Sequence, residues 1–225
     1  DMNDPKVYKL WQDGNSVGIF QFESQGMTNF MKELKPDCLE DIIAGVSLYR
    51  PGPMDQIPRY IANKKDPEHA VYTHPALKPI LEVTYGCMVY QEQVMQIVRD
   101  LAGYSLGRAD LVRRAMGKKK LDVMAKEREI FINGQLDENG NIVVPGCVRN
   151  GIDAKSANKI FDEMAEFAKY AFNKSHAAAY AVVSYRTAYL KAYYPAEFMA
   201  ATLNSFLGNL DKIPDYIEAV SYTHL

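Results

Sequence analysis

The sequence predicts a mainly α-helical protein with little β structure. Apolar residues recur at helical spacing in several long segments, most clearly at i, i+3, i+4 and i+7 between residues 94 and 101. Residues that begin or end helices flank these segments, whereas the alternating pattern of a half-buried strand is nearly absent. At 225 residues, with 48% apolar and 24% charged residues, the composition is that of an ordinary globular chain. We therefore expect seven or eight helices and a minor β component.

The first fifty residues are expected to hold one short strand and two helices. The polar opening, residues 1–10, gives no clear signal. An apolar run at 17–22 follows a turn signal and predicts a short strand. Ser24 is placed to cap a helix, whose apolar face is formed by Met27, Phe30, Met31 and Leu34. A second apolar helix is expected from Leu39 to Leu48, where a segment rich in proline and glycine ends it.

The middle of the chain combines a loop, two helices and a hairpin. Residues 63–79 contain three prolines and are expected to form an irregular loop. The stripe at 94–101 predicts a buried helix that Gly103 ends, and a basic helix is expected to start near Arg108. An Asn-Gly turn between apolar residues predicts a small hairpin at 135–145.

The C-terminal third is expected to be helical. Asp153 is a good N-cap for a helix that ends near Tyr170. A long helix rich in alanine and tyrosine is expected to be capped by Ser175 and to run to Tyr194. A further helix at 196–206 and a short acidic one near Asp215 complete the prediction.

The last five residues, SYTHL at 221–225, match neither the amphipathic pattern before them nor a capping pattern. From Val220 onward the sequence is the translation of GTC TCT TAT ACA CAT CTN, the end of a transposon used to prepare sequencing libraries. We therefore expect 221–225 to be a non-native tail and the reading frame to be truncated.

Several classes of protein are excluded by composition. The three cysteines are odd in number and far apart, which argues against a disulfide framework and a CxxC zinc site. The longest apolar stretches are too short to span a membrane, and residues 1–20 lack the pattern of a signal peptide. The reducing cytoplasm is thus the expected compartment, without a membrane partner.

Acid and metal catalysis find no support in the sequence. It contains no Asp-x-Asp pair, no Walker-type phosphate loop and no nucleophile elbow. Three acidic pairs are expected on solvated faces, namely Glu40–Asp41, Asp137–Glu138 and Asp162–Glu163. We predict no metal ligands and no catalytic residue in this chain.

Positive charge is concentrated in one segment. The net charge is only −2, yet residues 108–128 hold three acidic and eight basic side chains, the basic ones being Arg108, Arg113, Arg114, Lys118, Lys119, Lys120, Lys126 and Arg128. On a helix, Arg113 shares a side with Gly117, and Arg114 aligns with Lys118. Arginine forks and mobile lysines match phosphate oxygens, so this pattern indicates a triphosphate or another polyanion. A solvated helix end with the same charges is the alternative.

A second cluster lies just before the long C-terminal helix. Tyr170, Asn173, Lys174 and His176 fall within seven residues. The amino end of a helix presents N–H groups that attract anions, and a tyrosine can stack on a base or sugar. The two clusters together favour a compact nucleotide. A nucleic-acid-binding module without nucleotide selectivity and a purely structural scaffold remain the alternatives.

Five segments resemble one known family in order along the chain. They are FQFESQGM (20–27), LYRPGPM (48–54), TYGCMVYQEQVMQI (84–97), LAGYSLGRADLVRRAMGKKK (101–120) and FNKSHAAAYAVVSYRTAYLKAYYPAEFMAA (172–201). They resemble the alpha subunit of bacterial DNA polymerase III, a C-family replicative polymerase. The similarity spans about residues 7–210 and departs at 134–149, to which we assign no role.

The resemblance implies that residues 1–220 are a fragment of that subunit, its fingers domain, which closes over the incoming deoxynucleotide (dNTP). Arg113 and Arg114 would meet the triphosphate, with Tyr170 and His176 near the nucleotide and Asn173 and Lys174 in the same motif. Arg108, Lys118, Lys119 and Lys120 would supply further phosphate or DNA contacts.

The same resemblance implies the rest of the enzyme. Mg²⁺ would be held by catalytic aspartates of a palm domain upstream of Asp1, so this chain alone would bind nucleotide without polymerising it. Expected partners are dNTP, primer-template DNA and the remaining domains of the subunit, namely PHP, palm, thumb and C-terminal regions. The sliding clamp and clamp loader would be met through regions outside this chain.

Overall fold

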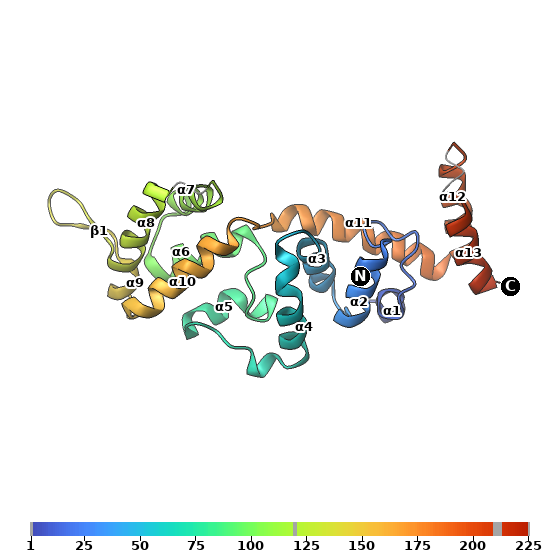
Figure 1. The fold of residues 1–225 in the computed structure, drawn as a ribbon, viewed down its shortest axis with the longest axis horizontal. Helices are drawn as coiled ribbons and strands as arrows, with labels where there is room; N and C mark the ends of the chain where they lie inside the picture. Colours follow the sequence, from blue (N-terminus) through green and yellow to red (C-terminus); the bar gives the residue numbers. More distant parts are fainter. Residues whose placement is uncertain (1, 119–120, 209–212, 225) are drawn as a thin grey trace. The chain divides into compact units, whose positions relative to one another are not determined.

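The protein is mainly α-helical, as predicted (Figure 1). The computed structural model describes residues 2–118, 121–208 and 213–224, and in these residues it has thirteen α-helices and one two-stranded sheet. The chain divides into two compact units, one formed by residues 1–46 with 175–225 and the other by 47–174. The predicted boundary of one domain at 1–220 stays a prediction.

The first unit is formed mainly by helices from both ends of the chain. They are α1 (Pro5–Asp13), α2 (Gln25–Leu34), α3 (Leu39–Leu48), α11 (Lys174–Tyr193), α12 (Pro195–Ser205) and α13 (Ile213–His224). Figure 1 shows α1 and α2 beside α11. Lys191 of α11 donates from Nζ to the carbonyl oxygens of Asn15 (2.9 Å) and Val17 (2.7 Å), and Ser184 Oγ donates to Phe20 O (2.8 Å). These contacts hold the segment between α1 and α2 against α11.

The predicted strand at 17–22 is wrong, because this segment forms consecutive turns. The Ile19 N–H donates to Ser16 O and the Phe22 N–H to Ile19 O, each at 3.0 Å. Gln21 has a positive φ of 68°, which no extended strand allows. Ile19 and Phe22 are both fully buried and lie three residues apart, so their burial follows a turn and not the two-residue repeat of a strand.

The helix α1 is absent from the prediction. Its N-cap is Asp4, whose side chain accepts from the Lys6 N–H at 2.9 Å, and Pro5 occupies the first helical position. It buries Val7, Tyr8 and Trp11. The predicted helices α2 and α3 are confirmed, with Ser24 capping α2 through the Met27 N–H.

One acidic residue departs from its expected solvated position. Asp41, in the first turn of α3, is only 1% exposed. Its Oδ2 accepts from the Asp37 N–H at 3.1 Å, so the carboxylate fixes the chain that enters the helix. The expectation fails because a carboxylate at a helix amino end can be buried when a backbone N–H donates to it.

The backbone of residues 221–224 continues α13, and Leu225 lies outside the described residues. A foreign origin of this tail therefore stays a prediction.

The second unit begins with short helical segments and continues into longer helices. They are η1 (Pro53–Gln56), α4 (Ile57–Lys65), η2 (Pro67–His69), η3 (Pro75–Leu77), α5 (Lys78–Leu81), η4 (Glu82–Thr84), α6 (Gln91–Ala102), α7 (Leu106–Gly117), α8 (Leu121–Asn133), α9 (Gly146–Arg149) and α10 (Ala154–Phe167). The helices α4, α5 and α9 explain much of the excess over the seven or eight expected. Each is short, so its apolar pattern is too brief to separate from a loop.

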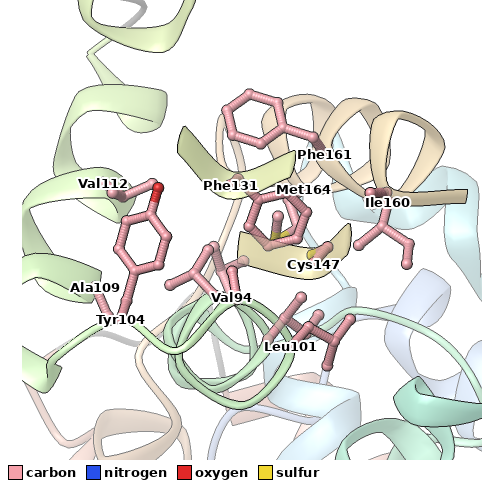
Figure 2. Close-up of a cluster of buried hydrophobic side chains, with 14 of the residues drawn as sticks. Val94, Leu101, Tyr104, Ala109, Val112, Phe131, Cys147, Ile160, Phe161 and Met164 are labelled. Carbon is pink, nitrogen blue, oxygen red and sulfur yellow. The ribbon is translucent and has the colours of Figure 1, made fainter. Parts of the chain in front are cut away.

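The core of the second unit lies among α6, α7, α8, α9 and α10 (Figure 2). The predicted stripe of α6 is confirmed, since Val94, Ile97, Val98 and Leu101 are all buried, and Gly103 ends the helix in the left-handed conformation. Figure 2 shows Val94 and Leu101 near Phe131, Cys147 and Met164, which come from α8, α9 and α10. Fully burying one such side chain contributes about 1.5–3 kcal/mol.

The predicted hairpin is also confirmed. Strands β1 (Gln135–Leu136) and β2 (Ile142–Val144) pair antiparallel, and Figure 1 shows their loop projecting from the helices. Asp137 Oδ1 accepts from the N–H groups of Asn139 (2.9 Å) and Asn141 (2.8 Å), which fixes the turn. Gly140 has a positive φ of 80°, as the Asn-Gly signal requires.

Two buried thiols predict a loss of stability at alkaline pH. Burial raises the pKa of Cys87 to about 11 and that of Cys147 to about 12. In the unfolded chain both thiols titrate near 8.5. Their contribution is fully present below pH ~8.5 and is lost as the pH rises toward 11, because the unfolded state then releases protons that the folded state keeps. Denaturant unfolding at pH 8 and 10.5 should show a falling free energy of unfolding. The decrease in the free energy of unfolding between the two pH values should be smaller in Cys147→Ala than in the wild type. An equal decrease in both proteins would contradict the prediction.

Candidate functional site

The two adjacent arginines of α7 share one carboxylate. Arg113 donates from Nε (3.0 Å) and Nη2 (2.7 Å) to Asp110 Oδ1, and Arg114 Nε lies 2.7 Å from Asp110 Oδ2. Hydrogen bonding from Arg113 is the main cause that lowers the pKa of Asp110. The Arg113 side chain is 24% exposed and that of Arg114 is 62% exposed. Asp110 therefore orients both guanidinium groups, and Arg114 is the more accessible of the two.

The helix α7 presents these arginines because its other side is apolar. Ser105 caps it by accepting from the Arg108 N–H, and its buried residues are Ala109, Val112, Ala115 and Met116. This spacing turns Arg113 and Arg114 away from the core.

The first turn of α6 connects Arg113 to the segment before α11. Gln91 Oε1 accepts from Arg113 Nη1 at 3.0 Å. The backbone N–H of Gln91 donates to Phe172 O at 2.9 Å, next to an isolated parallel bridge between Tyr90 and Phe172. Gln91 thus connects Arg113 of α7 to the segment before α11.

Glu92, the next residue, holds Asn173 and Lys174 at the end of the second unit. Its Oε1 accepts from Asn173 Nδ2 (3.0 Å), and its two carboxylate oxygens lie 3.1 and 3.2 Å from the Lys174 N–H. Lys174 Nζ lies 5.2 Å from the centroid of the Tyr90 ring. The expected anion-attracting N–H of α11 therefore already meets a carboxylate. Ser175 is not the cap, because the helix begins one residue earlier, at Lys174.

Tyr170 is held by the loop that follows α3. Arg50 donates from Nη2 to Tyr170 O (2.9 Å), and its guanidinium lies 4.0 Å from the centroid of the Phe172 ring. Burial lowers the pKa of Arg50. The Tyr170 ring lies directly against Gly52, while 47% of the tyrosine remains exposed. One side of the ring is thus packed and much of the residue faces solvent.

His176 belongs to the other compact unit. It is exposed on α11, and its ring centroid lies 4.3 Å from that of Tyr180. Tyr180 in turn lies 5.3 Å from Phe20, so the histidine ends a row of three aromatic rings in that unit.

The other predicted phosphate contacts differ in their exposure and in their partners within the chain. Arg108 donates to Glu127 Oε1 (3.1 Å) and Gln135 Oε1 (2.6 Å), and it lies over the Tyr104 ring. Its guanidinium therefore already has two acceptors within the second unit. Lys118 is exposed at the C-cap of α7, and the predicted Lys119 and Lys120 lie outside the described residues.

Within the second unit the structure brings Arg113, Asn173 and Lys174 to the first turn of α6, and it holds Tyr170 two residues from Phe172. The residues that join them, Gln91 and Glu92, are absent from the prediction. Both lie in a segment that carries the family resemblance, but their partners are 22 and 81 residues away along the chain. The spacing of residues within one helix cannot predict hydrogen bonds between residues so far apart along the chain.

Metal ligands are scarce in the described residues. One group of three candidate ligands lies together there, namely Asp37, Cys38 and Asp41. Burial raises the pKa of the Cys38 thiol to about 11, so it stays protonated at neutral pH. Mg²⁺ prefers six oxygen ligands in octahedral geometry, and this group does not provide them.

Among the helices of the described residues, none is long and apolar enough to cross a membrane.

Comparison with known families identifies the chain. A family model of the bacterial DNA polymerase III alpha subunit finger domain matches residues 1–139. The chain belongs to this finger-domain family. The match includes α6 and α7, and thus Gln91, Glu92 and both arginines.

Curated relatives extend the similarity beyond the matched part of the finger domain. The chain is 53% identical over 218 residues to the DNA polymerase III subunit alpha of Xylella fastidiosa (strain 9a5c). It is 50% identical over 217 residues to that of Neisseria meningitidis serogroup A and 51% identical over 216 residues to that of Rickettsia felis. Each alignment covers 96% of this chain but only 17–18% of the relative. The chain thus spans less than a fifth of these subunits.

Proposed function

We propose that this chain is the part of a bacterial replicative DNA polymerase that binds the triphosphate of the incoming dNTP and closes on the primer-template. The observation that carries this proposal is the convergence of Arg113, Asn173 and Lys174 on the first turn of α6. Arg114 adds an accessible guanidinium beside Arg113. The cationic side chains of Arg113, Arg114 and Lys174 suit a compact anion with several oxygen atoms.

The chemistry of these residues is electrostatic. Arg113, Arg114 and Lys174 offset the charge that develops on the β and γ phosphates as pyrophosphate leaves. Donors that are already oriented stabilise that charge without reorganisation. Tyr170 offers a ring for stacking. His176 on α11 stays a predicted nucleotide contact. In the complete subunit, Mg²⁺ would neutralise charge at the phosphates and would be held by residues outside this chain.

The remaining parts of the proposal concern the whole subunit. The catalytic carboxylates lie outside this chain, so the chain alone binds dNTP without incorporating it. Its partners in the bacterial cytoplasm are primer-template DNA and the other domains of the subunit. The sliding clamp and the clamp loader are met through regions outside this chain. Arg108 is assigned an internal role, because Glu127 and Gln135 already accept from it.

Titration with dNTP tests the binding step directly. We expect Arg113→Ala to weaken dNTP binding by about 10- to 150-fold, because hydrogen bonds to charged groups contribute about 1.5–3 kcal/mol. Arg99→Ala is the matched control, since Arg99 is also partly exposed and paired with a neighbouring aspartate, Asp100. Equal affinities of both variants and the wild type would contradict the proposal.

Salt dependence separates a nucleotide site from a nucleic-acid track. A track that neutralises six or more phosphates of single-stranded DNA gives a logarithmic salt slope of about −4 or steeper. A single triphosphate releases fewer counterions, so its slope is shallower. A single-strand affinity with the steep slope, combined with undetectable dNTP binding, would favour the nucleic-acid-binding alternative.

A further inference from the structure

Among the described residues, Gln91 hydrogen-bonds to both Arg113 and the segment before α11. Its side-chain oxygen accepts from Arg113 Nη1 at 3.0 Å, and its backbone N–H donates to Phe172 O at 2.9 Å. Asp110 accepts from the other two nitrogens of the same guanidinium, Nε and Nη2. All three nitrogens of Arg113 are therefore engaged, and the plane of the guanidinium is fixed by two partners on different helices.

The turn that carries Gln91 is itself well held. Gln93 is buried, and its Oε1 accepts from the N–H groups of Val89 (2.8 Å) and Tyr90 (2.9 Å). Glu92 binds Asn173 and the Lys174 N–H from the same turn. A rigid turn thus holds the partner of Arg113 on one side and the segment at 172–174 on the other.

We infer that Gln91 is a positioning residue for triphosphate binding, because it fixes the Arg113 guanidinium relative to Asn173 and Lys174. This inference rests on the proposed function. Arginine loses side-chain freedom when it binds an anion, and prior orientation removes part of that cost. Without the Gln91 oxygen, Arg113 keeps Asp110 as its acceptor but can pivot about that single partner. The affinity for the nucleotide falls, while the charge of the site is unchanged.

Two variants of Gln91 and one control test this role. Gln91→Met keeps the length and the backbone contact to Phe172 but removes the acceptor. Gln91→Glu restores an acceptor for Arg113. Gln135→Met is the matched control, because Gln135 Oε1 accepts from Arg108 in the same manner, at 2.6 Å. Circular dichroism of each variant shows whether the helical fold is kept.

The two readouts are dNTP affinity and the NMR signal of the Arg113 Nε–H, assigned through Arg113→Lys. We expect Gln91→Met to weaken dNTP binding by about three- to tenfold, as for one ordinary hydrogen bond, and to shift or broaden the Arg113 signal without nucleotide. Gln91→Glu should return that signal to a single sharp position. Gln135→Met should change neither readout.

Three results would overturn the inference. An unchanged Arg113 signal in Gln91→Met shows that Gln91 does not orient the arginine. An affinity equal to that of Gln135→Met, in a protein whose wild type binds dNTP, removes the functional role but leaves the proposed function standing. Absence of dNTP binding by the wild type overturns the proposed function, and this role is lost with it.

Discussion

Replacing Gly146 with alanine is expected to destabilise the second unit by more than about 3 kcal/mol. Gly146 begins α9 with a φ of +78°, which an L-residue rarely adopts. An added Cβ would lie 2.3 Å from the backbone N of Gly134 and 2.7 Å from the carbonyl carbon of Asn133. These are backbone atoms at the base of the hairpin, so they cannot move aside as a flexible side chain can.

A second glycine separates the steric effect from the conformational one. Gly151 has a φ of +84°, but an added Cβ there would meet no atom within 4 Å. Gly151→Ala should therefore lower the free energy of unfolding by only about 1–2 kcal/mol, the cost of the left-handed conformation for an L-residue. Denaturant unfolding of both variants and the wild type gives the comparison. Equal losses would show that the close approach of Gly146 to Asn133 and Gly134 is unimportant for stability.

The long helices of this fold are predictable because their apolar stripes are complete. In α6 and α10 four or more buried residues repeat at helical spacing, and an Asp153 cap marks the start of α10. The helix α1 shows that a short apolar pattern is not enough to predict a helix. Its nine residues bury only three side chains, and the pattern is shorter than two full repeats. The Asp4 cap and Pro5 were the available signals.

The segment at 17–22 shows that a short apolar run does not distinguish a strand from turns. Its apolar residues are compatible with a strand or with successive turns, because four apolar residues in six positions satisfy several periods. The structure resolves this through Lys191 and Ser184 of α11, which donate to carbonyl groups of this segment. The partners lie more than 160 residues away, and no local pattern encodes them.

For the candidate site, the sequence predicts charged groups but not the residues that hold them. Arg113 and Lys174 are predicted because their residue types match phosphate chemistry. Gln91, Glu92 and Arg50 act through contacts with distant residues, and a glutamine or an arginine gives no sign of such a contact in the sequence. The segments that resemble the family include these three residues, but the resemblance assigns them no role. Their assignment required the structure.

The Gly52→Ala variant is expected to lose both stability and nucleotide affinity. Gly52 has φ and ψ of 103° and −71°, a conformation that costs other residues about 1–3 kcal/mol. An added Cβ would also lie 2.3 Å from Cδ1 of the Tyr170 ring. The ring must then leave its packed position. If Tyr170 stacks on the nucleotide as proposed, the lost stacking of about 1–3 kcal/mol per base corresponds to a fall in dNTP affinity of about five- to 150-fold.

A double-mutant cycle with Tyr170→Ala distinguishes the two causes. If the ring clash displaces Tyr170, Gly52→Ala should cost less stability in the Tyr170→Ala background than in the wild type, and it should lower the dNTP affinity no further. Independent, additive effects in both measurements would mean that Gly52 acts through its backbone alone. In that case the loop at 48–54 would shape the chain without positioning the tyrosine. Coupling would instead connect this loop to the nucleotide through Tyr170, since Arg50 of the same loop already holds the Tyr170 carbonyl.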